Sequence, residues 1–161
     1  MRWMWIDRIL ELEHGRRCVA VKNVSLAEEH LHDHFPGTPV MPGSLMIEGM
    51  AQTAGILVGH ARDFKEKVIL AKIGKAVFER DVFPGSTLFY TATLDRIDGS
   101  GASTSGRVEL LDHADGERQT IGEVNLLFSH IDQNMSGLGF PERNFVFTEQ
   151  FFDLLRNSGF A

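Results

Sequence analysis

Residues 34–55 read HFPGTPVMPGSLMIEGMAQTAG, and this stretch decides the fold of the chain. It opens with a histidine and three prolines within nine residues, and the prolines restrict the backbone. The apolar run that follows, from Leu45 to Val58, is too long for one ordinary strand. Its leucine, methionine and alanine content predicts a helix. Because this helix is apolar over most of its circumference, we expect it to be buried.

The predicted helix also carries one polar stripe. Residues spaced three or four apart fall on the same side of a helix. On this helix they form a narrow stripe of Ser44, Glu48, Gln52, Gly55 and Gly59. The stripe must face something other than an apolar core, and either a cleft or a second subunit would serve.

The segments around the helix have the character of strands. Residues 17–24 are rich in β-formers, and residues 26–37 form a polar loop with at most one helical turn. Four strand-like segments follow the helix, and turn sequences at 84–86, 98–101 and 112–116 separate them. We therefore expect an α+β fold in which an antiparallel meander wraps around the buried helix. The strand-like segments after the helix are 67–83, 86–97, 103–112 and 118–131.

The bulk composition excludes several classes of protein. The net charge of −6 disfavours a general nucleic-acid binder, which needs a basic face. Cys18 is the single cysteine, so neither a disulfide nor a cysteine-rich zinc site can form within the chain. No apolar run is long enough for a membrane span, and the charged N-terminal stretch does not resemble a signal peptide. We expect a cytoplasmic protein.

The stretch around the helix start contains the residues for acid–base chemistry. Pro42, Gly43 and Ser44 lie where the helix begins, so unpaired N–H groups and the helix dipole favour an oxygen that gains negative charge, such as that of a thioester carbonyl. Glu48 in apolar surroundings could keep a proton and act as an acid. His34, held before the proline loop, is the natural base.

Each of these residues also has a structural interpretation. A single helical glutamate or a single histidine is more often structural than catalytic, and only the combination with the proline–glycine loop favours catalysis. His30, His32 and His34 would share one face of a strand, but we reject a metal site there because loop histidines are commonly solvated. Cys18 lies in an apolar segment and is better explained as a buried structural thiol. We expect no metal and no cofactor.

The segment HFPGTPVMPGSLMIEGMAQ resembles the signature of the β-hydroxyacyl-acyl carrier protein dehydratases, the FabZ/FabA group with the hot-dog fold. The similarity begins in WIDRILELEHG, continues through VAVKNV and GKAVFERDVFPG, and ends near Ile131. It implies a hot-dog domain over residues 1–131, with an antiparallel sheet wrapped around the long helix. Residues 132–161 then form a C-terminal extension.

The resemblance also implies an assembly and a set of site residues. It implies a homodimer or a trimer of dimers, in which two sheets join edge to edge and each site lies between two chains. His34 of one chain would face Glu48 of the other. The Gly43 amide would polarise the substrate carbonyl, the Val40 backbone would hold the histidine, and Gln52 would support the acid.

The function implied is the removal of water from (3R)-3-hydroxyacyl thioesters on acyl carrier protein, which gives trans-2-enoyl thioesters in fatty acid biosynthesis. Glutamate at position 48, where the branch that also isomerises the double bond typically has aspartate, favours dehydration alone. Two alternatives stay open: another hot-dog thioester enzyme, either an enoyl-CoA hydratase or a thioesterase, and a non-catalytic acyl-carrier-binding subunit. Acyl-chain length and the choice between carrier protein and coenzyme A also stay open.

One segment departs from the family pattern. The family often has a basic residue followed by proline where this chain reads FERDVFPGST, with Glu79, Asp81 and Ser86. Basic residues normally meet the acidic carrier protein. Those that could supply such a patch here are Lys72, Lys75, Arg80, Arg16 and Arg17.

The resemblance does not explain the C-terminal extension, which nevertheless predicts a helix. Thr148 is the expected N-cap, Phe147 and Phe152 a hydrophobic staple, and residues 157–159 the stop. A short helix with one apolar face should fold only when docked. It could simply stabilise its own domain, or it could cover the sheet or the mouth of the acyl tunnel and so restrict acyl length or oligomeric state.

Overall fold

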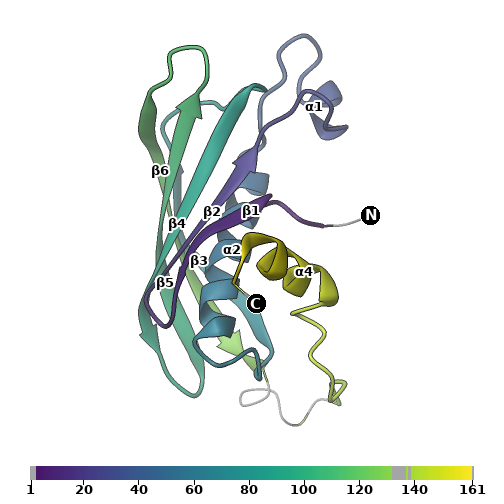
Figure 1. Ribbon diagram of the computed structural model, residues 1–161, viewed down its shortest axis with the longest axis vertical. Helices are drawn as coiled ribbons and strands as arrows, with labels where there is room; N and C mark the ends of the chain where they lie inside the picture. The colour runs from purple at the N-terminus through teal and green to yellow at the C-terminus, as the bar shows by residue number, and fades with distance from the viewer. Residues whose placement is uncertain (1–2, 132–136, 138, 161) are drawn as a thin grey trace.

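The computed structural model describes residues 3–131, 137 and 139–160. Six strands form one antiparallel sheet in the order β1-β2-β4-β5-β6-β3. The sheet curves along one side of a long helix, and a short C-terminal helix lies beside β1, on the same side of the sheet as the long helix (Figure 1). The elements are β1 (Arg8–Glu13), β2 (Arg17–Asn23), α1 (His30–Asp33), α2 (Gly43–His60), β3 (Val68–Phe78), β4 (Ser86–Ile97), β5 (Gly101–Asp112), β6 (Arg118–His130) and α4 (Glu149–Ser158).

The predicted buried helix is α2, and it is longer at both ends than the predicted 45–58. Its apolar side chains pack into the main core against the inner face of the sheet. The polar stripe has mixed surroundings: Ser44 is exposed, Glu48 and Gly55 are half-buried, and Gln52 and Gly59 are buried. The α+β architecture predicted from the sequence is therefore confirmed, with one long helix packed against one curved antiparallel sheet.

The predicted meander is wrong for one strand. The chain follows β4, β5 and β6 as neighbours, but β3 pairs with β6 at the far edge of the sheet and not with β4. β4 instead pairs with β2. The reason is that α2 carries the chain across the inner face of the sheet, so the chain re-enters at the opposite edge. Local pattern predicts β2, β3, β4, β5 and β6, but it does not predict which strands are neighbours.

β1 was not predicted, because its residues RILELE mix charged with apolar side chains. The regular alternation breaks at a bulge between Ile9 and Glu11. Ile9 is buried, whereas Leu10 is exposed. β1 forms one edge of the sheet and lies beside α4 (Figure 1).

The helix predicted in the extension is α4. Thr148 takes the N-cap position, although its side chain makes no capping hydrogen bond within the part of the chain that is described. Gly159 ends the helix with a positive φ of 87°, which glycine adopts without strain. The rings of Phe147 and Phe152 each pack edge-on against the ring of Phe64, at 5.1 and 5.4 Å between centroids. Residues 132–136 and 138, where the predicted extension begins, lie outside the described residues.

Candidate active site

His34 lies in a tight loop that connects α1 to α2. Its Nδ1 atom is 2.8 Å from the backbone oxygen of Val40. Because a carbonyl oxygen can only accept, Nδ1 carries the proton in the neutral ring and Nε2 keeps a free lone pair. The loop is closed by the Val40 N–H, which donates to the His34 oxygen at 2.8 Å, and by a pair of backbone bonds between Phe35 and Thr38. The loop therefore holds the imidazole in the tautomer in which Nε2 can act as a base.

The loop leads directly into the N-terminus of α2. The Met41 N–H donates to the Val82 oxygen at 2.8 Å, which fixes the loop to the segment before β4. Pro42 is the N-cap and makes no side-chain cap bond. Among the described residues, neither the Gly43 nor the Ser44 N–H donates to a backbone oxygen. Such unpaired groups at a helix N-terminus can bind an oxygen that becomes negatively charged.

Glu48 lies one and a half turns into α2 and is held by Gln52. The Gln52 Nε2 group donates to Glu48 Oε1 at 2.9 Å. The same nitrogen donates to the Trp3 oxygen at 2.9 Å, and Gln52 Oε1 accepts from the Trp5 N–H at 2.9 Å. Because the backbone groups have fixed roles, they determine which end of the amide faces the acid. The N-terminal segment is thus part of the support of Glu48.

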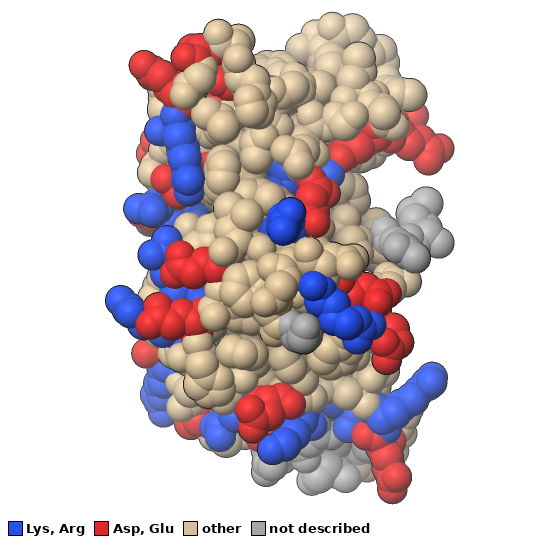
Figure 2. Space-filling model, viewed as in Figure 1, with Lys and Arg blue, Asp and Glu red and all other residues tan. Residues whose placement is uncertain are grey.

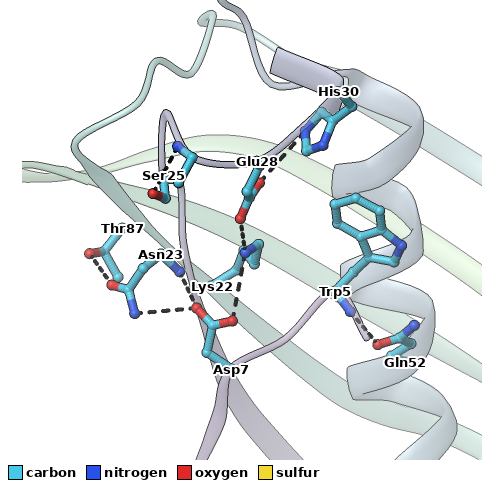
Figure 3. Close-up of polar contacts among 10 residues, drawn as sticks. Trp5, Asp7, Lys22, Asn23, Ser25, Glu28, His30, Gln52 and Thr87 are labelled. Atoms are coloured by element: carbon cyan, nitrogen blue, oxygen red, sulfur yellow. Dashed lines mark hydrogen bonds and ion pairs between the residues drawn. The ribbon is translucent and has the colours of Figure 1, made fainter. Parts of the chain in front are cut away.

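A polar network holds that N-terminal segment and the loop before α1 against the sheet (Figure 3). Lys22 is buried on β2 and pairs with Glu28 and, at 3.6 Å, with Asp7. Asp7 accepts from the Asn23 N–H at 2.6 Å. The ring of His30 packs edge-on against Trp5, and burial lowers the pKa of His30 below its ordinary value. The network was not predicted, because it joins Trp5 and Asp7 to β2 and to the loop before α1, and local sequence pattern does not show such contacts.

His34 and Glu48 line different pockets of the single chain. His34 and Gly43 line a cavity of about 390 Å³ together with Phe78 and Arg80. Glu48 lines another, of about 260 Å³, together with other residues of α2 and the start of β3. Each pocket is therefore lined by only some of the predicted catalytic residues, the proposed base in one and the proposed acid in the other.

The pocket of Glu48 has a wall that the sequence did not reveal. Val146, Phe147 and Phe151, from the C-terminal extension, line it beside Gly55 and Phe128. The apolar face of the predicted helix indicated that this segment docks, and the sheet and the mouth of the acyl tunnel were both possible docking sites. The pattern did not indicate that residues 146 and 147, before the helix, would line the pocket.

The sequence suggests two other sites, Cys18 as a nucleophile and the histidines before the proline loop as metal ligands, and the described residues support neither. Cys18 is fully buried on β2, and burial raises the pKa of its thiol to about 12, which keeps it protonated and unreactive. His30 and His32 lie in α1 rather than in a strand. Within residues 3–131, 137 and 139–160, no group of three or more histidine, cysteine or acidic side chains could hold a metal.

No helix in that part of the chain is long and apolar enough to cross a membrane.

Comparison with solved structures shows the fold. The dehydratase heterocomplex ApeI:P from Xenorhabdus doucetiae aligns with a TM-score of 0.57 at 18% identity, over 74% of this chain and 92% of that one. The conserved protein PA5202 from Pseudomonas aeruginosa aligns with a TM-score of 0.60 at 16% identity, over 76% and 86%. The fold is the predicted hot-dog fold.

Comparison of sequences shows the family. Residues 2–119 match the model of the FabA-like domain. A 3-hydroxyacyl-[acyl-carrier-protein] dehydratase FabZ from Thermomicrobium roseum is 37% identical over 131 residues, which cover 81% of this chain and 84% of that protein. The protein of the same name from Caldanaerobacter subterraneus subsp. tengcongensis is 43% identical over 96 residues, which cover 59% and 68%. Because the family model matches most of the chain and a relative this similar spans four fifths of it, the protein belongs to the FabA-like family.

Proposed function

We propose that the protein is a 3-hydroxyacyl-acyl carrier protein dehydratase that acts in fatty acid biosynthesis. The observation that carries the proposal is the imidazole of His34, whose Nδ1 is held by the Val40 oxygen so that Nε2 keeps its lone pair, in a chain that also has a supported carboxyl group at Glu48. The relatives that are 43% and 37% identical to this chain over the aligned residues have this activity in their names. We also propose a cytoplasmic location, because the proposed enzyme would find the substrates of fatty acid synthesis in the cytoplasm.

The proposed reaction is the elimination of water across C2 and C3 of the acyl chain. His34 Nε2 takes a proton from C2, and the electron pair of that C–H bond forms the C2–C3 double bond. The C3–O bond breaks, and Glu48 gives its proton to the departing hydroxyl group, which leaves as water. The Gly43 N–H donates to the thioester oxygen while negative charge builds on it. The proton on His34 returns to Glu48 through solvent before the next turnover.

The proposed site needs two chains. Within one chain His34 and Glu48 line separate pockets, so we propose that His34 of one protomer meets Glu48 of its partner. The surface that supports this assembly is the edge strand β3, which has exposed apolar side chains at Leu70, Ile73 and Val77. An open edge with apolar residues pairs readily with another strand. Two sheets joined at β3 would form a homodimer, which could assemble further into a trimer of dimers.

We propose that the acyl carrier protein docks near the pocket of His34. Arg80 lines that pocket, and its guanidinium donates to Gln119 at 2.7 Å. Arg16 and Arg17 instead lie at the β1–β2 hairpin, where each is paired with a glutamate. Acidic and basic side chains are interspersed on the face seen in Figure 2, so a local contact at Arg80 fits better than a broad basic surface.

The proposal is tested by following enoyl thioester formation through its ultraviolet absorbance. The purified protein is given (3R)-3-hydroxyacyl thioesters of several lengths, on acyl carrier protein and on coenzyme A. We expect absorbance to rise without release of free thiol. Release of thiol without the absorbance change would identify a thioesterase. Activity on coenzyme A alone would favour a hydratase working in reverse, and no turnover of any substrate would overturn the enzymatic proposal.

A further inference from the structure

The C-terminal extension forms part of the pocket that holds Glu48. Three of its side chains, Val146, Phe147 and Phe151, line this cavity of about 260 Å³. They lie beyond residues 2–119, which match the family model. The wall is thus built from a part of the chain outside the shared domain.

The extension is held firmly where it meets α2. Phe147 is 5% exposed, and its ring occupies the space beside Gly59 where any other residue would place a Cβ atom, 2.4 Å from Phe147 Cζ. The Asn144 side chain donates to the backbone oxygens of Phe64 and Glu66 at 3.2 and 3.0 Å. Its Oδ1 accepts from the N–H groups of residues 146 and 147 at 3.0 and 3.1 Å. Both amide ends of Asn144 are therefore used to fix the chain at the wall.

The position of the wall relative to the acid can be followed along α2. Glu48, Gly55 and Gly59 lie on one stripe of the helix, and Glu48 and Gly55 both line the pocket. At a rise of about 1.5 Å per residue, Gly55 lies roughly 10 Å from Glu48 along the axis and Gly59 roughly 16 Å. Phe147 stands against Gly59. A chain that runs from Glu48 along this stripe therefore meets the aromatic wall beyond Gly55.

We propose that Phe151 and Val146, held in place by Phe147, close the end of the acyl pocket and limit the length of the acyl chain that the enzyme accepts. This inference rests on the proposed dehydratase function. Phe151 is half-buried, and its ring contacts Phe147 edge-on at 6.1 Å between centroids. A single methylene in an apolar pocket changes kcat/KM by about 10- to 200-fold, so one ring at its end is enough to separate short from long chains.

The test compares two substitutions on the same helix. Phe151→Ala removes a ring that lines the pocket. Phe152→Ala removes a neighbouring half-buried ring that packs against Phe64 and, within the described residues, does not line the pocket. The measured quantity is the ratio of kcat/KM for a twelve-carbon to that for a four-carbon (3R)-3-hydroxyacyl thioester. We expect Phe151→Ala to raise this ratio about tenfold or more and Phe152→Ala to leave it unchanged.

If the loss of the ring in Phe151→Ala impairs folding, a substitution that enlarges a wall residue still tests the inference. Val146→Phe adds bulk at the wall, and we expect it to lower the ratio of long-chain to short-chain activity. Binding of saturated acyl thioesters, which have no 3-hydroxyl group to lose, gives the same comparison by calorimetry without turnover. An unchanged ratio in both Phe151→Ala and Val146→Phe, or an equal change in Phe152→Ala, would overturn the inference.

The two proposals fail in different ways. If the unmodified protein dehydrates neither substrate, the proposed function is wrong, and the binding comparison still tests the wall. If it dehydrates the short substrate but the Phe151→Ala and Val146→Phe variants keep its length preference, the function stands and the role of the extension is wrong.

Discussion

Gln52 links the carboxyl group of Glu48 to the N-terminal segment of the chain. Its Nε2 donates to Glu48 Oε1 and to the Trp3 oxygen, each at 2.9 Å, and its Oε1 accepts from the Trp5 N–H. Gln52 is 6% exposed, and two of these bonds run to backbone groups, whose roles as donor and acceptor are fixed. The orientation of the proposed acid therefore depends on residues that precede the sheet.

The first prediction concerns this link. Gln52→Leu keeps the volume but leaves the Trp3 oxygen and the Trp5 N–H without partners. We expect the free energy of unfolding to fall by about 1–3 kcal/mol. We expect kcat to fall by about 10- to 100-fold with KM little changed, because the acid is misplaced rather than removed. Chemical denaturation and steady-state kinetics measure the two effects. The same replacement at the exposed Gln150 is the control and should change neither.

The second prediction concerns the two groups that would transfer protons. His34→Ala and Glu48→Gln should each lower kcat by about 10²- to 10⁴-fold, the usual effect of removing a positioned base or acid. Both residues are only half-buried, so the melting temperature should change little. Near-normal turnover by either folded variant would contradict the proposed mechanism.

The third prediction concerns the proposed sharing of the site between chains. When inactive His34→Ala and Glu48→Gln subunits exchange at random, half of the dimers are mixed. One of the two sites in each mixed dimer then has both residues intact. About a quarter of the wild-type activity should return if the sites act independently. Each variant taken through the same exchange alone should stay inactive. Exchange shown by mass measurement without recovered activity would exclude a shared site.

The fourth prediction concerns pH. Burial lowers the pKa of His60 below its ordinary value, and the nearby His14, whose ring lies 5.0 Å away, adds to this, while Asp63 acts in the opposite direction. The unfolded state therefore binds the proton more tightly, so stability increases with pH in this range. We expect the free energy of unfolding to fall as the pH drops below about 6.5, the unperturbed value for histidine.

The test of this effect is the slope of stability against pH. In His60→Gln the slope measured by urea denaturation should be shallower. It should not vanish, because burial also lowers the pKa of His30. An unchanged slope would show that His60 does not contribute.

Features encoded by nearby residues could be predicted from the sequence, and features that depend on distant pairings could not. The apolar run before Gly59 predicted a buried helix, and the pattern around Thr148 predicted α4, because helix periodicity and caps are local properties. The order of the strands is a property of the whole chain, and β3 was assigned the wrong neighbour. The contact between Phe147 and Gly59 joins residues far apart in the sequence, so the pocket wall appears only in the folded structure.

The last prediction uses two glycines of α2 as a matched pair. A Cβ atom at position 59 would lie 2.4 Å from Phe147 Cζ and 2.9 Å from Phe64 Cδ1, whereas one at position 55 would meet the Phe128 ring at 3.8 Å, an ordinary contact. Alanine is favoured over glycine inside a helix by about 1 kcal/mol, so Gly55→Ala should raise the free energy of unfolding by up to that amount. Gly59→Ala has the same intrinsic gain but forces the rings apart, and overpacking of this kind costs about 1–3 kcal/mol. The two variants should therefore change stability in opposite directions in chemical denaturation. Equal stabilisation by both would show that the extension is not seated on Gly59.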